Sequence, residues 1–318
     1  MTLDLLLLVL GLAILIKGAD LLVDGASSLA SRLGVSALVI GLTVVAFGTS
    51  APELVVNILA SVKGNSDIAI GNIVGSNIAN ILLILGIAAV IYPLAVKRGT
   101  VWKEIPLAFL AMWVMALTAN DILIEGSGWA GLTRIDGFIL LSFFLIFLYY
   151  TFEISKVTGG SVEKIKVIKW STSIFMVLAG LAALTLGGKW VVDGAIAVAK
   201  YFDLSEALIG LTIVAVGTSL PELATSAVAA YKRNADIAVG NIVGSNIFNI
   251  FWILGLSAIL RPLPFSPALN TDVLVGLVAT IILFMFMFIG KKHTLERWQG
   301  FLFIALYFIY VAYLIYRG

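Results

Sequence analysis

Long apolar stretches fill most of this chain, and short polar segments separate them. Ten of the stretches are long enough to cross a hydrocarbon core about 30 Å thick as an α-helix. They lack the alternation over about ten residues that is typical of membrane β-barrel strands. The pattern therefore predicts an all-α integral membrane protein with ten transmembrane helices. The predicted spans are residues 2–32, 36–61, 67–93, 104–120, 133–155, 170–200, 205–231, 236–262, 271–290 and 297–316.

The composition supports this class of protein. Of the 318 residues, 61% are hydrophobic and 12% are charged, and the mean hydropathy is +1.11. Soluble globular domains do not have such a composition. The absence of cysteine excludes disulfides and thiolate metal sites. The first apolar stretch carries Asp4 where a signal peptide has basic residues, so we interpret it as a retained helix.

Lysine and arginine residues predict the orientation in the membrane. If the N-terminus lies outside, 13 of them fall in cytoplasmic segments and 5 in outside segments, with Lys17 and Lys189 inside spans. Positive residues concentrate on the cytoplasmic side of membrane proteins. We therefore expect both termini outside, in a multi-pass protein of the cell (inner) membrane.

The chain contains an internal duplication. A shift of 169 residues places 41–86 on 210–255 without a gap, and 30 of these 46 positions are identical. "GLTVVAFGTSAPEL" matches "GLTIVAVGTSLPEL", and "DIAIGNIVGSNIAN" matches "DIAVGNIVGSNIFN". The ends of the halves also correspond, with "RIDGF" at 134–138 matching "RWQGF" at 297–301.

Each copy holds five predicted spans, so the second copy must enter the membrane in the opposite orientation to the first. Inverted repeats of this kind are typical of secondary transporters, whose substrate site lies near the membrane midplane between the repeats. We predict a first five-helix repeat at 1–155, a short cytoplasmic linker at 156–169 and an inverted repeat at 170–318.

Glu53 and Glu222 hold equivalent positions in the two copies, each within an otherwise apolar span. An ionisable residue inside a membrane is costly and indicates a functional site. The second, third, seventh and eighth predicted spans contain no basic residue that would neutralise these acids. We therefore expect a mobile cation or a proton to do so.

Hydroxyl groups accompany both glutamates. Thr49 and Ser50 precede Glu53 by four and three residues, so they lie near the same side of a helix. Thr218 and Ser219 repeat this arrangement in the second copy. These hard oxygen ligands match Ca²⁺ and Na⁺, and they argue against Zn²⁺ or Cu²⁺.

A local helix break is predicted beside each glutamate. Proline lacks an amide hydrogen and clashes with the preceding turn, and glycine and proline recur here as Gly48 and Pro52, then as Gly217 and Pro221. We expect the break to free backbone carbonyls as further ligands. These carbonyls belong to Ala46, Phe47, Ala215 and Val216.

A polar stripe marks the next span. Asn72, Ser76 and Asn80 recur every four residues and so share one helical face. The stripe is compatible with hydrogen bonds between helices or with ion coordination, and its duplication beside the glutamate motif favours ion contact. The second copy has Asn241, Ser245 and Asn249.

These motifs, "GTSAPEL" with "GNIVGSNIAN" and "GTSLPEL" with "GNIVGSNIFN", resemble the paired alpha-repeats of sodium/calcium exchangers in the cation/Ca²⁺ exchanger superfamily. The ten spans and short central loop are similar to its prokaryotic members. The resemblance implies exchange of Na⁺ for Ca²⁺ through four clustered ion sites, with the first and sixth spans sliding over the other eight. It implies a ligand set of Ala46, Thr49, Ser50, Glu53, Ser76, Asn80, Ala215, Thr218, Ser219, Glu222, Ser245 and Asn249.

Details of the motif bear on the coupling ion. Several relatives carry Asp at the position of Asn249, including K⁺-dependent exchangers, so Asn there favours K⁺-independent exchange. The Ca²⁺/H⁺ branch has a different motif without the paired hydroxyls, so Thr49 and Ser50 favour Na⁺ over H⁺. A Ca²⁺/H⁺ antiporter, a K⁺-dependent exchanger and a passive cation channel remain as alternatives.

Charges in the first and sixth spans have two interpretations. Lys17, Asp20 and Asp24 lie in the first span, and Lys189 and Asp193 lie in the sixth. Structural or gating salt bridges are favoured over direct ion contact.

No catalytic Asp pair, Ser/His set or zinc motif is found in the sequence, so we do not expect an enzyme. We expect no cofactor, nucleic acid or obligate protein partner. The predicted partners are the lipid bilayer and the transported Ca²⁺ and Na⁺.

Overall fold

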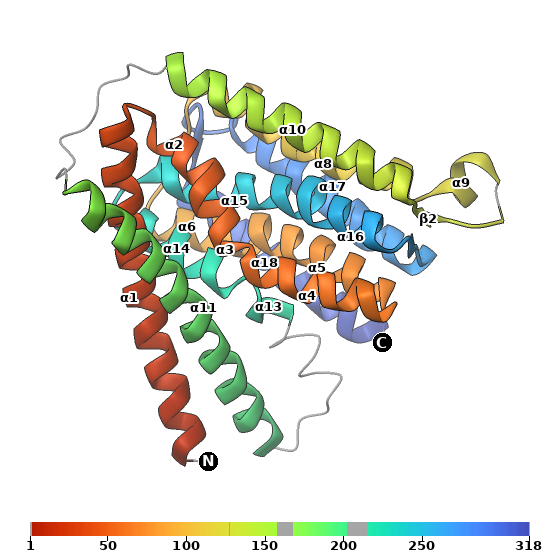
Figure 1. Ribbon diagram of the computed structural model, residues 1–318, viewed down its shortest axis with the longest axis horizontal. Coiled ribbons are helices and arrows are strands. Elements are labelled where there is room, and N and C mark those ends of the chain that lie inside the picture. The colour runs from red at the N-terminus through yellow and green to blue at the C-terminus, as the bar shows by residue number, and fades with distance from the viewer. Residues whose placement is uncertain (1, 127, 158–167, 202–214, 318) are drawn as a thin grey trace.

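The computed structural model describes residues 2–126, 128–157, 168–201 and 215–317 (Figure 1). Within this part, eight helices are long and apolar enough to cross a membrane. One further pair, Ala37–Thr49 and Ala51–Lys63, is equivalent to a single span bent by 47°. These nine segments each overlap one predicted span. The protein is therefore an all-α membrane fold, as its hydropathy predicts.

The remaining predicted span, 205–231, which is the seventh along the chain, begins outside the described residues. Its described part forms α13 (Ala215–Gly217) and α14 (Leu220–Tyr231). Most of the predicted linker, 156–169, also lies outside the described part.

The first half of the chain contains α-helices, two π-helical segments and two short strands. In order they are α1 (Thr2–Leu33), α2 (Ala37–Ile40), η1 (Gly41–Val45), α3 (Ala46–Thr49), α4 (Ala51–Lys63), α5 (Ser66–Ala79), η2 (Asn80–Ile84), α6 (Leu85–Ile91), β1 (Leu94–Ala95), α7 (Arg98–Trp102), α8 (Glu104–Thr118), α9 (Asp121–Glu125), β2 (Gly131–Leu132) and α10 (Arg134–Val157).

Most of this order recurs in the described part of the second half, where α9 has no counterpart. After α11 (Trp170–Tyr201), α13 and α14 come α15 (Ala235–Ile247), η4 (Phe248–Leu254), α16 (Gly255–Leu260), β3 (Leu263–Pro264), η5 (Pro267–Leu269), α17 (Asn270–Phe286), β4 (Thr294–Leu295) and α18 (Arg297–Arg317).

The most buried spans are the two that carry the duplicated "GNIVGSN" motif. In the span of α5, η2 and α6, 78% of the most apolar window is buried, and in the span of α15, η4 and α16 the share is 83%. The other long described spans reach at most 44%. The polar stripes of Asn and Ser therefore lie at the centre of the molecule, away from lipid.

Helices α1 and α11 lie side by side along one flank (Figure 1). They are antiparallel and their backbones touch. A Cβ added at Gly18 would lie 3.0 Å from the Gly180 oxygen, and one added at Gly187 would lie 2.8 Å from the Gly11 oxygen. Small residues allow such close helix approach within membranes. The glycines of the first and sixth predicted spans thus join these two helices into a pair.

Two short strand pairs connect the halves. β1 pairs antiparallel with β4, with Leu94 opposite Leu295. β2 pairs antiparallel with β3, with Leu132 opposite Leu263. The 169-residue shift places β1 on β3, and the match of "RIDGF" to "RWQGF" places β2 on β4. Each strand pair is therefore the counterpart of the other.

Candidate ion-binding site

The predicted helix breaks beside the glutamates are present in both halves. α3 ends at Thr49 and α4 begins at Ala51, with Ser50 between them at φ −80° and ψ 7°. Ser219 has nearly the same conformation, φ −89° and ψ 8°, before α14. Proline occupies the first turn of each following helix, where its missing amide hydrogen would have no helical acceptor. The sequence thus places each glutamate in the first turn of a helix that starts inside the protein.

Each glutamate is buried and hydrogen-bonded by a serine from the other half. Glu53 and Glu222 are both 1% exposed. Ser219 donates to Glu53 Oε1 at 3.1 Å, and Ser50 donates to Glu222 Oε1 at 2.9 Å. Because each serine lies three residues before the glutamate of its own half, these bonds bring the two acids together in one site.

The stripe serines complete the contacts of the same carboxylate oxygens. Ser76 donates to Glu53 Oε1 at 3.5 Å, and Ser245 donates to Glu222 Oε1 at 3.3 Å. The ion pairs formed within the described residues include neither glutamate. Two buried acids therefore share a polar site in which serine hydroxyls of both halves donate to their carboxylates.

Four buried oxygens in this region have no hydrogen-bond partner within the described part of the chain. They are Glu53 Oε2, Glu222 Oε2, Asn80 Oδ1 and Asn249 Oδ1. Carboxylate and amide oxygens are acceptors and buried acceptors are normally satisfied, so these atoms fit a donor or a cation. The 169-residue shift relates the two glutamate oxygens to each other, and likewise the two asparagine oxygens. They form a symmetric set of hard oxygen ligands.

The threonine hydroxyls donate to the asparagines that begin the opposite stripe. Thr49 Oγ1 donates to Asn241 Oδ1 at 3.0 Å, and Thr218 Oγ1 donates to Asn72 Oδ1 at 3.5 Å. Hydrogen bonding between helices therefore accounts for Asn72 and Asn241. The threonine oxygens keep lone pairs for a further interaction.

The prediction of freed backbone carbonyls is wrong at two positions. The Ala46 oxygen accepts the Ser50 amide at 3.0 Å. The Val216 oxygen accepts the Ser219 amide at 3.1 Å. The helix bends over fewer residues than we expected, so these carbonyls keep backbone donors. The Phe47 and Ala215 carbonyls stay predictions as ligands.

Asn77 and Asn246 were missed in the sequence, although both contact the site. Asn80 Nδ2 donates to Asn246 Oδ1, and Asn249 Nδ2 donates to Asn77 Oδ1, each at 2.9 Å. Asn77 and Asn246 follow directly after Ser76 and Ser245, so they lie off the face of the four-residue stripe. Their repetition in both copies of "GNIVGSN" was the available signal.

π-Helical turns occur at the outer candidate ligands. η2 begins at Asn80, and Asn249 is the second residue of η4. Such turns are rare and frequently mark functional sites in α-helices. Propensity and periodicity do not reveal them.

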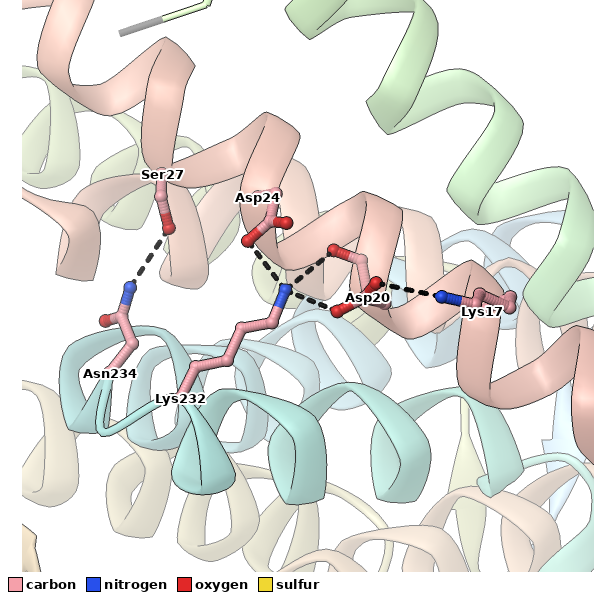
Figure 2. Close-up of polar contacts among 6 residues, drawn as sticks. All are labelled: Lys17, Asp20, Asp24, Ser27, Lys232 and Asn234. Atoms are coloured by element: carbon pink, nitrogen blue, oxygen red, sulfur yellow. Dashed lines mark hydrogen bonds and ion pairs between the residues drawn. The ribbon is translucent and has the colours of Figure 1, made fainter. Parts of the chain in front are cut away.

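The acids of the first span form salt bridges with a lysine of the second half, a partner that the sequence did not indicate. Lys232, directly after α14, contacts Asp20 at 2.5 Å and Asp24 at 2.6 Å (Figure 2). Lys17 contacts Asp20 at 3.6 Å. Ser27 and Asn234 extend the same interface by a hydrogen bond of 3.1 Å. The salt-bridge interpretation is confirmed for α1.

The corresponding charges of α11 lie at a cavity. Lys189 and Asp193 line a space of about 390 Å³ together with Pro52, Thr218 and Pro221. Thr218 belongs to the candidate site, so the cavity reaches the site from the side of α11.

Within the described residues, no three or more His, Cys, Asp and Glu side chains gather as a metal site. The candidate site instead combines two acids with neutral oxygens. That combination suits Na⁺ and Ca²⁺ better than transition metals.

Comparisons with known proteins agree with this chemistry. The model of the family described as "Sodium/calcium exchanger protein" matches residues 3–153 and 172–316. The sodium/calcium exchanger MaX1 of Methanosarcina acetivorans is 35% identical, with 99% of this chain and 98% of that protein covered. The inner membrane protein YrbG of Escherichia coli (strain K12) is 36% identical, with 89% and 88% covered.

A solved structure has the same fold. The sodium-calcium exchanger NCX_Mj, soaked with 10 mM Na⁺ and 10 mM Sr²⁺, superposes with a TM-score of 0.84 at 35% identity, and 98% of each chain is covered. The family model and the relatives cover both halves of the chain. This protein therefore belongs to the sodium/calcium exchanger family.

Proposed function

We propose that this protein is a secondary active antiporter that exchanges Na⁺ for Ca²⁺ across a membrane by alternating access. The observation that carries the proposal is the pair of buried glutamates, each bonded by a serine of the other half and each with one unpartnered oxygen within the described residues. The named exchangers among its relatives support the choice of ions.

The two acids provide a physical basis for coupled transport. Two carboxylates about 5 Å apart repel each other by about 3 kcal/mol at an effective dielectric constant of about 20. A site with both charges uncompensated resists being sealed from water. The carrier is therefore expected to change its facing only after cations have bound, which prevents uncoupled leakage.

We propose that the ion ligands come from equivalent residues of the two halves. The glutamates hold Ca²⁺, and hydroxyl, amide and carbonyl oxygens complete the Ca²⁺ and Na⁺ sites. The proposed set is Ala46, Thr49, Ser50, Glu53, Ser76, Asn80, Ala215, Thr218, Ser219, Glu222, Ser245 and Asn249. Ala46 remains in it because a carbonyl oxygen has more than one lone pair.

We further propose ten transmembrane helices arranged as two inverted five-helix repeats. The contacts between the halves are reciprocal, which supports this arrangement: Ser50 with Glu222 answers Ser219 with Glu53. The two strand pairs are reciprocal in the same way. Reciprocal contacts are the mark of a two-fold relation between two surfaces. Secondary transporters place their substrate site at such an interface.

The described conformation is proposed to face outward. Lys232 closes the α1 side by its ion pairs, whereas the cavity on the α11 side reaches Thr218. With both termini outside, the cavity opens to the outside of a cell (inner) membrane. Sliding of the α1–α11 pair would close this cavity and open the opposite side.

Reconstituted protein tests the proposed exchange. Vesicles loaded with Na⁺ and diluted into Na⁺-free medium should take up ⁴⁵Ca²⁺, and external K⁺ should not change the rate. A pH gradient of equal size should drive no uptake. Uptake driven by protons in the absence of Na⁺ would identify a Ca²⁺/H⁺ antiporter, and ⁴⁵Ca²⁺ uptake that needs no counter-ion would identify a channel.

A further inference from the structure

Four asparagines link the two central spans next to the glutamates. Asn77 and Asn80 come from one span, and Asn246 and Asn249 come from the other. All four are at most 3% exposed. Six side-chain donors and acceptors of this group bond to each other or to backbone oxygens, and two oxygens do not.

The backbone determines the orientation of Asn246. Its Nδ2 donates to the backbone oxygen of Asn77 at 3.3 Å. A backbone carbonyl can only accept, so the atom facing it must be the amide nitrogen. The side-chain oxygen of Asn246 is then directed at its other partner, Asn80.

The side-chain oxygen of Asn246 in turn orients Asn80. An amide oxygen only accepts, so the end of Asn80 that faces it is Nδ2, at 2.9 Å. The oxygen of Asn80 therefore points away from Asn246, and it is one of the buried oxygens without a partner in the described part. Asn80 follows Ser76 by one helical turn on the same side of the span, and Ser76 donates to Glu53.

The second half repeats the relay. Asn77 Nδ2 donates to the backbone oxygen of Asn246 at 3.2 Å, and Asn77 Oδ1 accepts from Asn249 Nδ2 at 2.9 Å. Asn249 Oδ1 is left without a described partner, as Asn80 Oδ1 is. Each relay thus starts at a backbone carbonyl of one span and ends at a candidate ligand oxygen.

We propose that Asn77 and Asn246 are positioning residues that turn the side-chain oxygens of Asn249 and Asn80, respectively, toward the transported cations. The proposal rests on the function proposed above and assigns a role to two residues outside its ligand set. An asparagine that turned its amide over would present hydrogen atoms to a cation and repel it. The relays prevent this, because the turned amide would place two oxygens against each other.

Crossed rescue distinguishes positioning from a merely structural role. Asn77→Ala leaves the backbone anchor of Asn246 intact and releases only Asn249. Asn246→Ala releases only Asn80. The half-saturating Ca²⁺ concentration for exchange should rise about three- to tenfold in each, the effect of one hydrogen bond, with little change in the maximal rate.

Aspartate removes the need for orientation, because its two oxygens are equivalent ligands. In an Asn249→Asp background, Asn77→Ala should therefore raise the half-saturating Ca²⁺ concentration much less than it does in the wild type. In an Asn80→Asp background, it should raise this concentration as much as it does in the wild type. Asn246→Ala should show the opposite pattern. Equal effects of each alanine in all backgrounds would mean that the asparagines only support packing, and would overturn the proposal.

The measurement uses full-length protein in proteoliposomes, with ⁴⁵Ca²⁺ uptake as the readout. Asn77→Leu and Asn246→Leu, which preserve more side-chain volume, replace the alanine variants if those do not fold. The coupling ion is tested separately on the wild type. If protons drive wild-type uptake, the proposed Na⁺ coupling fails, and the crossed rescue still reports on the relays.

Discussion

Two sets of equivalent residues lie at opposite ends of the α1–α11 pair, and they differ in their contacts. We call the end with Asp20 and Asp24 the α1 end, and the end with Lys189 and Asp193 the α11 end. At the α1 end, Lys232 is ion-paired with Asp20 and Asp24, and Val23 beside them is 1% exposed. At the α11 end, the equivalents of these residues are Lys63, Lys189, Asp193 and Val192. Lys63 is exposed, and the other three line the cavity.

The difference follows partly from one substitution between the repeats. Asp20 corresponds to Lys189, so the positions equivalent to the two acidic partners of Lys232 hold one base, Lys189, and one acid, Asp193. The central site is nearly identical in both halves, whereas the closures at its two ends are not. The duplication has therefore preserved the residues around Glu53 and Glu222 and changed those at the two ends of the α1–α11 pair.

The largest predicted effect on exchange comes from the two glutamates, which are identical in both halves. Glu53→Gln and Glu222→Gln should each abolish exchange, because each removes one of the two charges that we propose bind Ca²⁺ and resist a change of facing by the empty carrier. Both should fold, since glutamine has nearly the same shape. Proteoliposome ⁴⁵Ca²⁺ uptake is the measurement. Normal transport by either variant would refute the site and its symmetry.

The serines across the interface should have the next largest effect. Ser50→Ala and Ser219→Ala each remove one charge-assisted hydrogen bond to the opposite carboxylate. Each should raise the half-saturating Ca²⁺ concentration about ten- to a hundredfold, the usual effect of one such bond. Ser142→Ala, on an exposed helix face, is the matched control and should change nothing. Clearly unequal effects of the two site serines would show that the central site is asymmetric.

Loss of the Lys232 ion pairs should make the accessibility of the two ends more alike. The chain has no cysteine, so a single introduced cysteine reports on access. Val192→Cys should react readily with a membrane-impermeant thiol reagent, and Val23→Cys should be protected. Lys232→Met should raise the labelling of Val23→Cys about three- to tenfold, because partly exposed ion pairs contribute about 0.5 to 1 kcal/mol each. Lys232→Arg, which preserves the charge, is the control, and an unchanged rate in Lys232→Met would exclude a closing role.

The smallest effect should come from restoring an acidic residue at the α11 end. Lys189→Asp places an acid at the position equivalent to Asp20, so that Lys63 could pair with two acids as Lys232 does at the α1 end. Labelling of Val192→Cys should fall about two- to threefold, since the gain is one exposed ion pair. Lys189→Ser separates the loss of the lysine from the gain of the acid. Labelling that falls equally in both variants would contradict the ion-pair explanation.

The sequence predicted the membrane class, the nine described spans and the meeting of Glu53 with Glu222. Apolar length determines the spans, and proline in the first turn determines the breaks before Glu53 and Glu222. The duplication made the pairing of the glutamates a strong inference, because equivalent positions of two related halves come to equivalent depths.

Other features depend on packing between distant segments. Lys232 lies 212 residues from Asp20, and no local periodicity links them. Asn77 and Asn246 each bond across the two central spans, to the backbone and to the stripe asparagine of the opposite half, and such contacts cannot be read from the periodicity of one span. The Ala46 carbonyl was predicted to be free because proline breaks helices, but the break occurs after the Ser50 amide has already bonded to it.

Equilibrium binding of ⁴⁵Ca²⁺ to the purified protein at rising Na⁺ concentration tests the shared site most directly. We predict that Na⁺ displaces Ca²⁺ completely and with a steep dependence, because several Na⁺ ions occupy the oxygens around Glu53 and Glu222. The double variant Glu53→Gln/Glu222→Gln should bind no Ca²⁺. Binding that Na⁺ leaves unchanged, or that survives in the double variant, would contradict a common site built on these two acids.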